Sequence, residues 1–154
     1  MKKIALASIA LLVLIAVLLA VTLHFREKGR PAPAPAAPVS EPVTGRLVIR
    51  SLADMQVGGK PIVLCGVANR KPAALQPMLL DAARKAWHGR DVTCVPVGLG
   101  TPCDGRASAT FGRALVVQCM DGDVDMAADL ADKGILCDLP EQSGGRYRPC
   151  QPAG

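Results

Sequence analysis

The residues whose types and spacing suggest chemistry follow a short apolar run, Pro61 to Val67. After Ala68 the chain continues with Asn69, Arg70 and Lys71, so the loop presents one amide and two cations and contains no carboxylate. A hard dication requires several oxygen ligands, and the two cations would repel it. The segment is therefore a candidate binding loop and an unsuitable metal site.

Two other polar patterns have structural interpretations that are simpler than chemical ones. Asp121, Asp123 and Asp125 alternate like the first ligands of a calcium-binding EF-hand loop. Met126, however, stands where the sharp turn of such a loop requires glycine. Acidic residues at the start of a helix cap it and offset its dipole, and we adopt that interpretation. His88 lies at the expected end of another helix, where interaction with the helix dipole is a commoner role than catalysis.

The elements that must position these residues follow from hydrophobic periodicity. Residues 46–67 predict a three-stranded meander with a tight turn at Gly58-Gly59, and two more strands are expected at 91–95 and 112–119. A helix is expected from Pro72 to a stop at His88-Gly89, and a second one from Asp125 to a stop at Gly134. The apolar residues at helical spacing in the first helix are Met78, Leu79, Ala82, Ala83 and Ala86, and those in the second are Met126, Ala127, Leu130 and Ala131.

Five strands with a helix after the third and another after the fifth give the layout of an OB-fold barrel. The predicted fold class is therefore mainly β with two or three helices (α+β), built on a five-stranded OB-fold barrel. One transmembrane helix is expected to precede it. Residues 4–23 are almost entirely apolar and would span roughly 30 Å as a helix, which matches the hydrocarbon core of a bilayer.

The chain is accordingly divided into three parts. Residues 1–28 are expected to be a retained membrane anchor with its flanks, and a cleaved signal peptide is the alternative. Residues 29–44 are a Pro/Ala-rich linker, and residues 45–154 are the folded domain. The expected location is the inner membrane, crossed once by residues 4–23, with the domain in the periplasm or outside the cell. If the segment is cleaved, the protein is secreted.

All six cysteines lie in the predicted domain, and none has the paired CxxC spacing of a zinc site. An even count behind a membrane-inserting segment argues for disulfides in an oxidising compartment. Adjacent strands would bring Cys94 near Cys119, closing a loop of about 26 residues that contributes ~3 kcal/mol or somewhat more. Cys150 is close enough in sequence to bond Cys137. The connectivity stays open among about fifteen possibilities, which also involve Cys65 and Cys103.

The charge of the predicted domain gives little support to nucleic-acid binding. From Gly45 onward the chain has thirteen Lys and Arg against eleven Asp and Glu, so this part carries a charge of only +2. One Trp, one Tyr and two Phe in the whole chain offer few platforms on which bases can stack. A nucleic-acid partner is therefore possible but weakly supported.

A set of short motifs spans about residues 45–150 in a fixed order. The first motif is Leu64 with Gly66-Val67, and the second is Ala82 followed by Gly89, Val92 and Cys94. The third is Phe111-Gly112-Arg113 leading to Cys119. The fourth is Leu130 and Gly134, followed by Ser143-Gly144-Gly145-Arg146-Tyr147. Each motif is weak alone, but in this order and spacing they resemble the staphylococcal nuclease-like (thermonuclease) family.

That resemblance implies phosphodiester hydrolysis with one calcium ion held by carboxylates, a Glu that helps activate water, and two Arg that stabilise the phosphate charge. Placed on this sequence, the fifth-strand Arg is Arg113, and Asp54 lies one residue from the position of the first-hairpin Asp. The third-strand Arg falls at about Val63, the metal-binding Asp at Ala68 and the Glu near Lys71. Most catalytic positions are thus substituted, which implies a fold kept and a reaction lost. Arg113 has two open interpretations, a phosphate contact or a strand-start residue paired with a carboxylate.

Three functions are compatible with these observations. The favoured one is a catalytically inactive binding or assembly module of the cell envelope, without a cofactor, whose nearly neutral, aromatic-poor domain suits a protein partner. The first alternative is an active calcium-dependent nuclease that cleaves DNA or RNA. The second alternative is a disulfide-rich envelope protein unrelated to nucleases.

Overall fold

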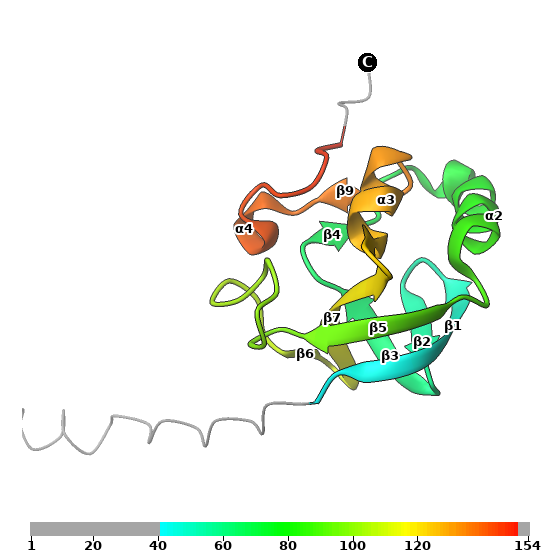
Figure 1. Cartoon of the computed structure of the whole chain (residues 1–154). Helices are drawn as coiled ribbons and strands as arrows, with labels where there is room; N and C mark the ends of the chain where they lie inside the picture. Colours follow the sequence, from blue (N-terminus) through cyan, green and yellow to red (C-terminus); the bar gives the residue numbers. More distant parts are fainter. Residues whose placement is uncertain (1–40, 151–154) are drawn as a thin grey trace, which may run out of the picture. The chain divides into compact units, whose positions relative to one another are not determined.

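The computed structural model describes residues 41–150, which form a closed β-barrel (Figure 1). Its strands are β1 (Val43–Ser51), β2 (Asp54–Val57), β3 (Lys60–Leu64), β5 (Asp91–Pro96) and β7 (Ala114–Asp121). β1 pairs antiparallel with β2 and β5, β2 with β3, and β5 with β7. The parallel pairing of β3 with β7 closes the barrel. The prediction of a mainly β protein with a five-stranded barrel is confirmed, and the strand order is consistent with an OB-like barrel.

The barrel closes around side chains that alternate along its strands. In β1, Leu47 and Ile49 are buried in the core, whereas Arg50 is exposed. β5 repeats the pattern with Val92 and Cys94 inside. This period of two is the pattern of a strand with one buried face, and it explains why the strands could be read from the sequence.

Helices cover part of the barrel. The described residues contain a 3-10 turn, η1 (Ala73–Leu75), followed by α2 (Gln76–Trp87), and then α3 (Met126–Asp132) and α4 (Pro140–Ser143). The first predicted helix is therefore split, because the 3-10 turn follows Pro72 and the α-helix begins only at Gln76. α3 packs its apolar side into the core, and Asp125 caps it by accepting hydrogen bonds from the N–H groups of Ala127 (2.8 Å) and Ala128 (3.3 Å). The capping interpretation of Asp125 is confirmed.

His88, directly after α2, has a structural function that differs from the expected one. Its Nδ1 accepts a hydrogen bond from the backbone N–H of Ile49 at 3.1 Å. The imidazole thus fastens the end of the helix to β1.

Four two-residue strands were not predicted. β4 (Val67–Ala68) pairs with β9 (Cys137–Asp138), while β6 (Thr110–Phe111) and β8 (Val124–Asp125) each pair with β7. The predicted strand at 112–119 therefore starts too early. Gly112 and Arg113 form the turn between β6 and β7, because Phe111 pairs with Ala114.

Three disulfides join the six cysteines, and among residues 41–150 no cysteine is free. Cys94 and Cys119 are direct partners in the β5–β7 ladder, as expected from neighbouring strands. Cys137 bonds Cys150 and holds the C-terminal segment to β9, which is the second expected pair. The pair that the sequence left open, Cys65–Cys103, fastens the loop after β5 to the end of β3.

The domain starts slightly earlier than predicted. Val43 and Thr44, assigned to the linker, belong to β1, where they pair with Cys94 and Thr93, and Val43 is buried. The expected anchor at residues 4–23 and the rest of the linker lie outside the described residues. Within residues 41–150, no helix combines the length and hydropathy needed to cross a bilayer.

Candidate functional site

The predicted binding loop is built around the side chain of Asn69. Its Oδ1 accepts a hydrogen bond from the backbone N–H of Lys71 at 3.0 Å, and its Nδ2 donates to Oε1 of Gln76. Gln76, the first residue of α2, closes the ring by donating from Nε2 to the carbonyl oxygen of Lys71 at 3.1 Å. The amide of Asn69 is therefore engaged in ordering its own loop. Asn69 thereby positions Lys71, using one donor and one acceptor of its amide.

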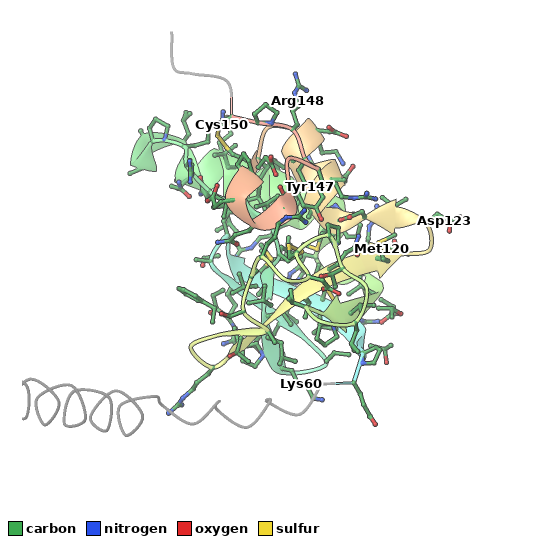
Figure 2. The ribbon with its side chains drawn as sticks, turned by 90° about the vertical axis from the view of Figure 1, so that its left-hand side faces the viewer. Lys60, Met120, Asp123, Tyr147, Arg148 and Cys150 are labelled. Atoms are coloured by element: carbon green, nitrogen blue, oxygen red, sulfur yellow. A yellow bond between two sulfur atoms is a disulfide. The ribbon has the colours of Figure 1, made fainter. Side chains whose placement is uncertain are left out.

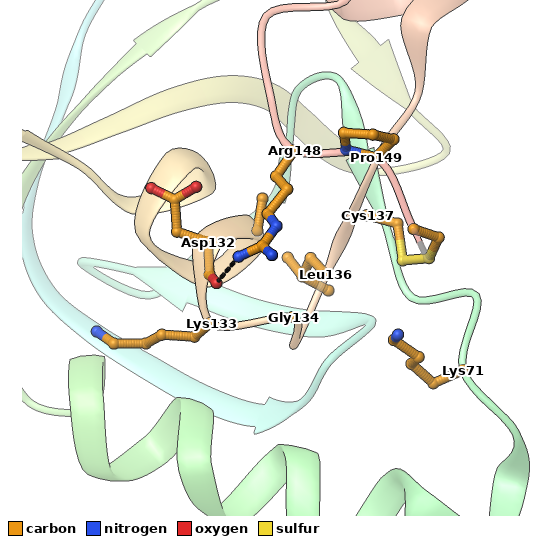
Figure 3. Close-up of a pocket in the computed structure, with 10 residues that line it drawn as sticks. Lys71, Asp132, Lys133, Gly134, Leu136, Cys137, Arg148 and Pro149 are labelled. Carbon is orange, nitrogen blue, oxygen red and sulfur yellow. Dashed lines mark hydrogen bonds between the residues drawn. A yellow bond between two sulfur atoms is a disulfide. The ribbon is translucent and has the colours of Figure 1, made fainter. Parts of the chain in front are cut away.

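The two cations of the loop have different surroundings. Arg70 approaches Glu141 at 3.8 Å, with both side chains more than half exposed, so this ion pair contributes little to stability. Lys71 lines a cavity of about 210 Å³ between the end of α3 and the C-terminal segment (Figure 3). Of the predicted loop, Lys71 is thus the residue that the structure places at a concave surface.

We call this space the basic cavity. Figure 3 shows Lys71 and Lys133 on opposite sides of it and Arg148 between them. Nη1 of Arg148 donates to the carbonyl oxygen of Asp132 at 3.0 Å, which satisfies a backbone acceptor at the end of α3. The full lining is Lys71, Ala131, Asp132, Lys133, Gly134, Leu136, Cys137, Arg148, Pro149 and Cys150.

An apolar groove of about 610 Å³ adjoins the basic cavity and shares Lys133 with it. We call it the α2 groove, because it follows the outer side of that helix. The side chain of Met78 is 62% exposed there, a large fraction for a residue of its size. The lining is Met78, Leu79, Ala82, Lys85, Ala86, Lys133 and Ile135.

Lys133 is held between the groove and the core by Asp129. Nζ of Lys133 lies 2.5 Å from Oδ2 of Asp129, and the same carboxylate accepts a hydrogen bond from Nε1 of Trp87 at 2.7 Å. Burial of Asp129 opposes ionisation, but the hydrogen bonds from Lys133 and Trp87 outweigh it and hold the pKa of this carboxyl below its usual value. A buried aromatic residue and a cation at the groove are thus joined through one ionised acid.

Arg113 lies far from the binding loop. The parallel register pairs Ile62 with Leu115, which sets Arg113 level with Lys60 at the start of β3. Leu64, at the other end of β3, is about 13 Å further along the strand, and the loop comes later still. Figure 2 shows Lys60 at one end of the domain and Arg148 of the basic cavity at the other. The two predicted groups of site residues therefore occupy opposite ends of the barrel.

Arg113 is also not a strand-start residue paired with a carboxylate, as one of its interpretations required. It lies in the β6–β7 turn, is exposed, and forms no ion pair with any residue in the range 41–150. Asp54, the first residue of β2, lies about 10 Å from it along the strand direction and two strands away around the barrel. The structure thus separates Arg113 from Asp54 as well.

Other carboxylates are engaged in structural bonds. Asp104 accepts hydrogen bonds from the N–H groups of Gly98 and Gly100, both at 2.7 Å, and from the hydroxyl of Thr101 at 2.6 Å, and the Thr101 bond is the largest of the effects that lower its pKa. Buried Asp138 accepts from the hydroxyl of Ser143. Within the described part of the chain, no three His, Cys, Asp or Glu side chains gather in a way that could hold a metal ion.

The motif Ser143-Gly144-Gly145-Arg146-Tyr147 also serves the fold. A Cβ on Gly66 would lie 2.7 Å from Cβ of Ser143, so the turn after β3 requires glycine for this close approach. Tyr147 is buried, and its hydroxyl donates to Oδ2 of Asp125 at 3.4 Å. Burial raises the pKa of Tyr147 strongly, with the charge of Asp125 adding to the effect. These residues therefore hold the C-terminal segment against the barrel.

Comparison of this chain with models of known protein families and with curated proteins finds no match. The surface that sequence reasoning missed is the α2 groove, with its cations Lys85 and Lys133, together with Arg148 in the adjoining basic cavity. A signal was present, since Met78, Ala82 and Ala86 recur every four residues, but helical spacing alone grouped them with Leu79 and Ala83 in one apolar set.

Proposed function

We propose that this protein is a catalytically inactive, nuclease-like OB-fold binding module, held by residues 4–23 in a membrane with its domain in an oxidising compartment. The observation that carries the proposal is the separation of Arg113 from the loop at 69–71. In the family that the motifs resemble, cations and acids must converge on one phosphate, because hydroxide attack on an anionic ester requires its charge to be offset. Here Arg113 lies level with the start of β3, whereas the loop at 69–71 comes after the other end of that strand and after β4.

The substitutions in the loop support the same conclusion. Ala68 and Lys71 stand where the family places acids, and the amide of Asn69 is engaged with Lys71 and Gln76. A hard cation needs several oxygen ligands, which this loop does not supply. The α2 groove and the basic cavity are two concave surfaces of the domain, and their apolar and cationic lining suits binding rather than hydrolysis.

The disulfides support the compartment. Such bonds persist in oxidising environments and are rare in the reducing cytosol. Each bond joins different elements: Cys94–Cys119 lies within the barrel, Cys65–Cys103 fastens the loop after β5 to the end of β3, and Cys137–Cys150 fastens the C-terminal segment to β9. Mass spectrometry of the unreduced protein should find no free thiol, and six free thiols would contradict the compartment.

The test of inactivity is a cleavage assay on the full-length protein, produced in an oxidising compartment and purified in mild detergent. Linear DNA and single-stranded RNA are incubated with and without calcium. We expect the same background for the wild type, Arg113→Ala and Arg46→Ala, where Arg46 is a matched exposed arginine in β1. Calcium-dependent cleavage that is lost in Arg113→Ala and kept in Arg46→Ala would identify an active nuclease and overturn the proposal.

A further inference from the structure

We infer that the α2 groove and the basic cavity together bind an acidic, amphipathic helix of a protein partner. The inference rests on the proposed function and names the chemistry of the partner. Its starting point is that the outer side of α2 is apolar without being needed for the fold. Leu79, Ala83 and Trp87 form the inner side and are buried, whereas Met78 and Ala82 point outward and are exposed.

The shape of the groove fits a helix. Met78, Ala82 and Ala86 form a row along α2 that extends about 12 Å from first to last, with Met78 and Ala82 exposed and Ala86 half-buried against the core. The two alanines leave room for a second backbone to approach closely, and Ile135 provides an apolar opposite wall. A partner helix that places apolar side chains at positions i, i+4 and i+7 would cover the row with about two turns.

Addition of a strand is not available at this place. α2 packs on β1, since Nε of Arg84 donates to the carbonyl oxygen of Ile49 at 3.0 Å. β1 is already hydrogen-bonded to β2 on one side and β5 on the other. A partner strand would find no free edge there, which excludes strand addition at β1, and the apolar row favours packing of a helix.

The charges select an acidic partner. The lining of the two spaces contains four cations, Lys71, Lys85, Lys133 and Arg148, against the single carboxylate of Asp132. With Lys133 neutralised by Asp129, two positive charges remain uncompensated. Such complementarity at the rim of an interface steers association and excludes partners of like charge. Carboxylates beside the apolar row of the partner would face Lys85 on one flank of the α2 groove. At the end of the groove that adjoins the basic cavity, they would face Lys71 and Arg148.

The experiment is site-specific photo-crosslinking in living cells. A photoreactive amino acid replaces Ala82 in the full-length chain, and a second version carries it at Phe111, which is 73% exposed at the opposite end of the barrel. We expect irradiation to yield an adduct with another protein from position 82 and none from position 111. Peptide mass spectrometry of the adduct should locate the attachment in a helical segment with apolar residues every three or four positions and a net negative charge.

Charge reversal tests the acidic character. Lys85→Glu should reduce the adduct yield about tenfold, as expected for a like-charge contact that costs ~1.4 kcal/mol. Lys60→Glu, at the far end of the domain, should leave the yield unchanged. Replacing one carboxylate of the identified segment with lysine should restore the yield in Lys85→Glu. The three disulfides and the circular dichroism spectrum of each variant verify that it is folded.

Several results would overturn the inference. The first is the absence of an adduct at position 82. The second is an adduct with something other than a protein partner, namely lipid, nucleic acid, a second copy of this chain or its own linker. The third is an adduct whose yield does not respond to Lys85→Glu. In each case the proposed function is judged separately by the cleavage assay. An inactive protein without an adduct at 82 means that its partner binds elsewhere, whereas calcium-dependent cleavage removes the proposed function itself.

Discussion

The two sides of α2 have similar composition and opposite environments. On the inner side, Leu79, Ala83 and Trp87 contact the barrel core, and each is at most 8% exposed. On the outer side, Met78 and Ala82 carry the same apolar character into solvent. A single helix thus presents one apolar row that the fold requires and one that the fold leaves uncovered.

The difference separates stability from binding. Burial of apolar surface stabilises a fold in proportion to the area removed from water, so the inner row contributes to folding and the outer row does not. The exposed apolar side chains of the outer row, beside Lys85 and Lys133, are the surface to which we assign the partner. Substitutions on the two rows should therefore affect different measurements, stability for the inner row and partner binding for the outer row.

The largest contrast is between Trp87→Ala and Met78→Ala. Trp87 is almost fully buried and donates to Asp129, so its removal should lower the free energy of unfolding by about 3–5 kcal/mol through the cavity and the lost partner. Met78→Ala should change it by less than about 0.5 kcal/mol, since an exposed side chain loses little on truncation. Urea unfolding followed by circular dichroism measures the stability of both variants. Tryptophan fluorescence cannot be used, because Trp87→Ala removes the only tryptophan.

The same two variants also separate binding from folding. Met78→Ala should reduce crosslinking from position 82 while remaining as stable as the wild type. Equal destabilisation by the two substitutions would show that Met78 is part of the core and that the outer row is not free. A stable Met78→Ala with full crosslinking would exclude Met78 from the interface.

The barrel was predictable because its information is local. The alternation of buried and exposed positions, as at Leu47 and Ile49, can be recognised from neighbouring residues in the sequence alone. The hairpin at Arg113 was missed because Gly112 was read as part of a strand, although its φ of +59° suits a two-residue turn. The short strands β4 and β9 have two residues each, too few to show any period. Their pairing depends on contacts between distant parts of the chain.

The site was less predictable for a geometric reason. Leu79 and Ala83 form one row of the helix, and Met78 and Ala82 form the next, about 100° around the axis. A sequence with apolar residues in both rows does not tell which row faces inward until the helix is placed on the barrel. Lys71 and Arg148 likewise become neighbours only after β4 pairs with β9 and Cys137 bonds Cys150.

A smaller contrast is expected between two consecutive cations of α2. Arg84 donates to the carbonyl oxygens of Ile49 at 3.0 Å and Arg50 at 2.8 Å, whereas Lys85 lines the α2 groove. Arg84→Ala should lower the free energy of unfolding by about 1–2 kcal/mol, because two hydrogen bonds from a charged group are lost at a partly exposed place. Lys85→Ala should stay within about 0.5 kcal/mol of the wild type. Trp87 fluorescence in urea measures both, and destabilisation by Lys85→Ala would assign that side chain to the fold.

The last contrast concerns Asp129, which joins the two sides of α2 through Trp87 and Lys133. Its pKa is lower in the folded protein than the usual 3.8, so its ionised form stabilises the fold above about pH 4. That stabilisation is lost as the pH falls through the lowered pKa, because the folded state then takes up a proton that the unfolded state already carries. Asp129→Asn should therefore differ most from the wild type near neutral pH and converge with it as the pH falls through the lowered pKa of Asp129.

Lys133→Met sharpens the same measurement. Without the ammonium group, burial of Asp129 is opposed mainly by the Trp87 hydrogen bond, so the acid-induced loss of stability should begin at a higher pH than in the wild type. Urea midpoints between pH 7 and 2.5, followed by Trp87 fluorescence, give both curves. A constant difference between Asp129→Asn and the wild type across this range would show that Asp129 acts through packing alone. In that case the cation at the groove would be uncoupled from the core, and the two sides of α2 would be independent.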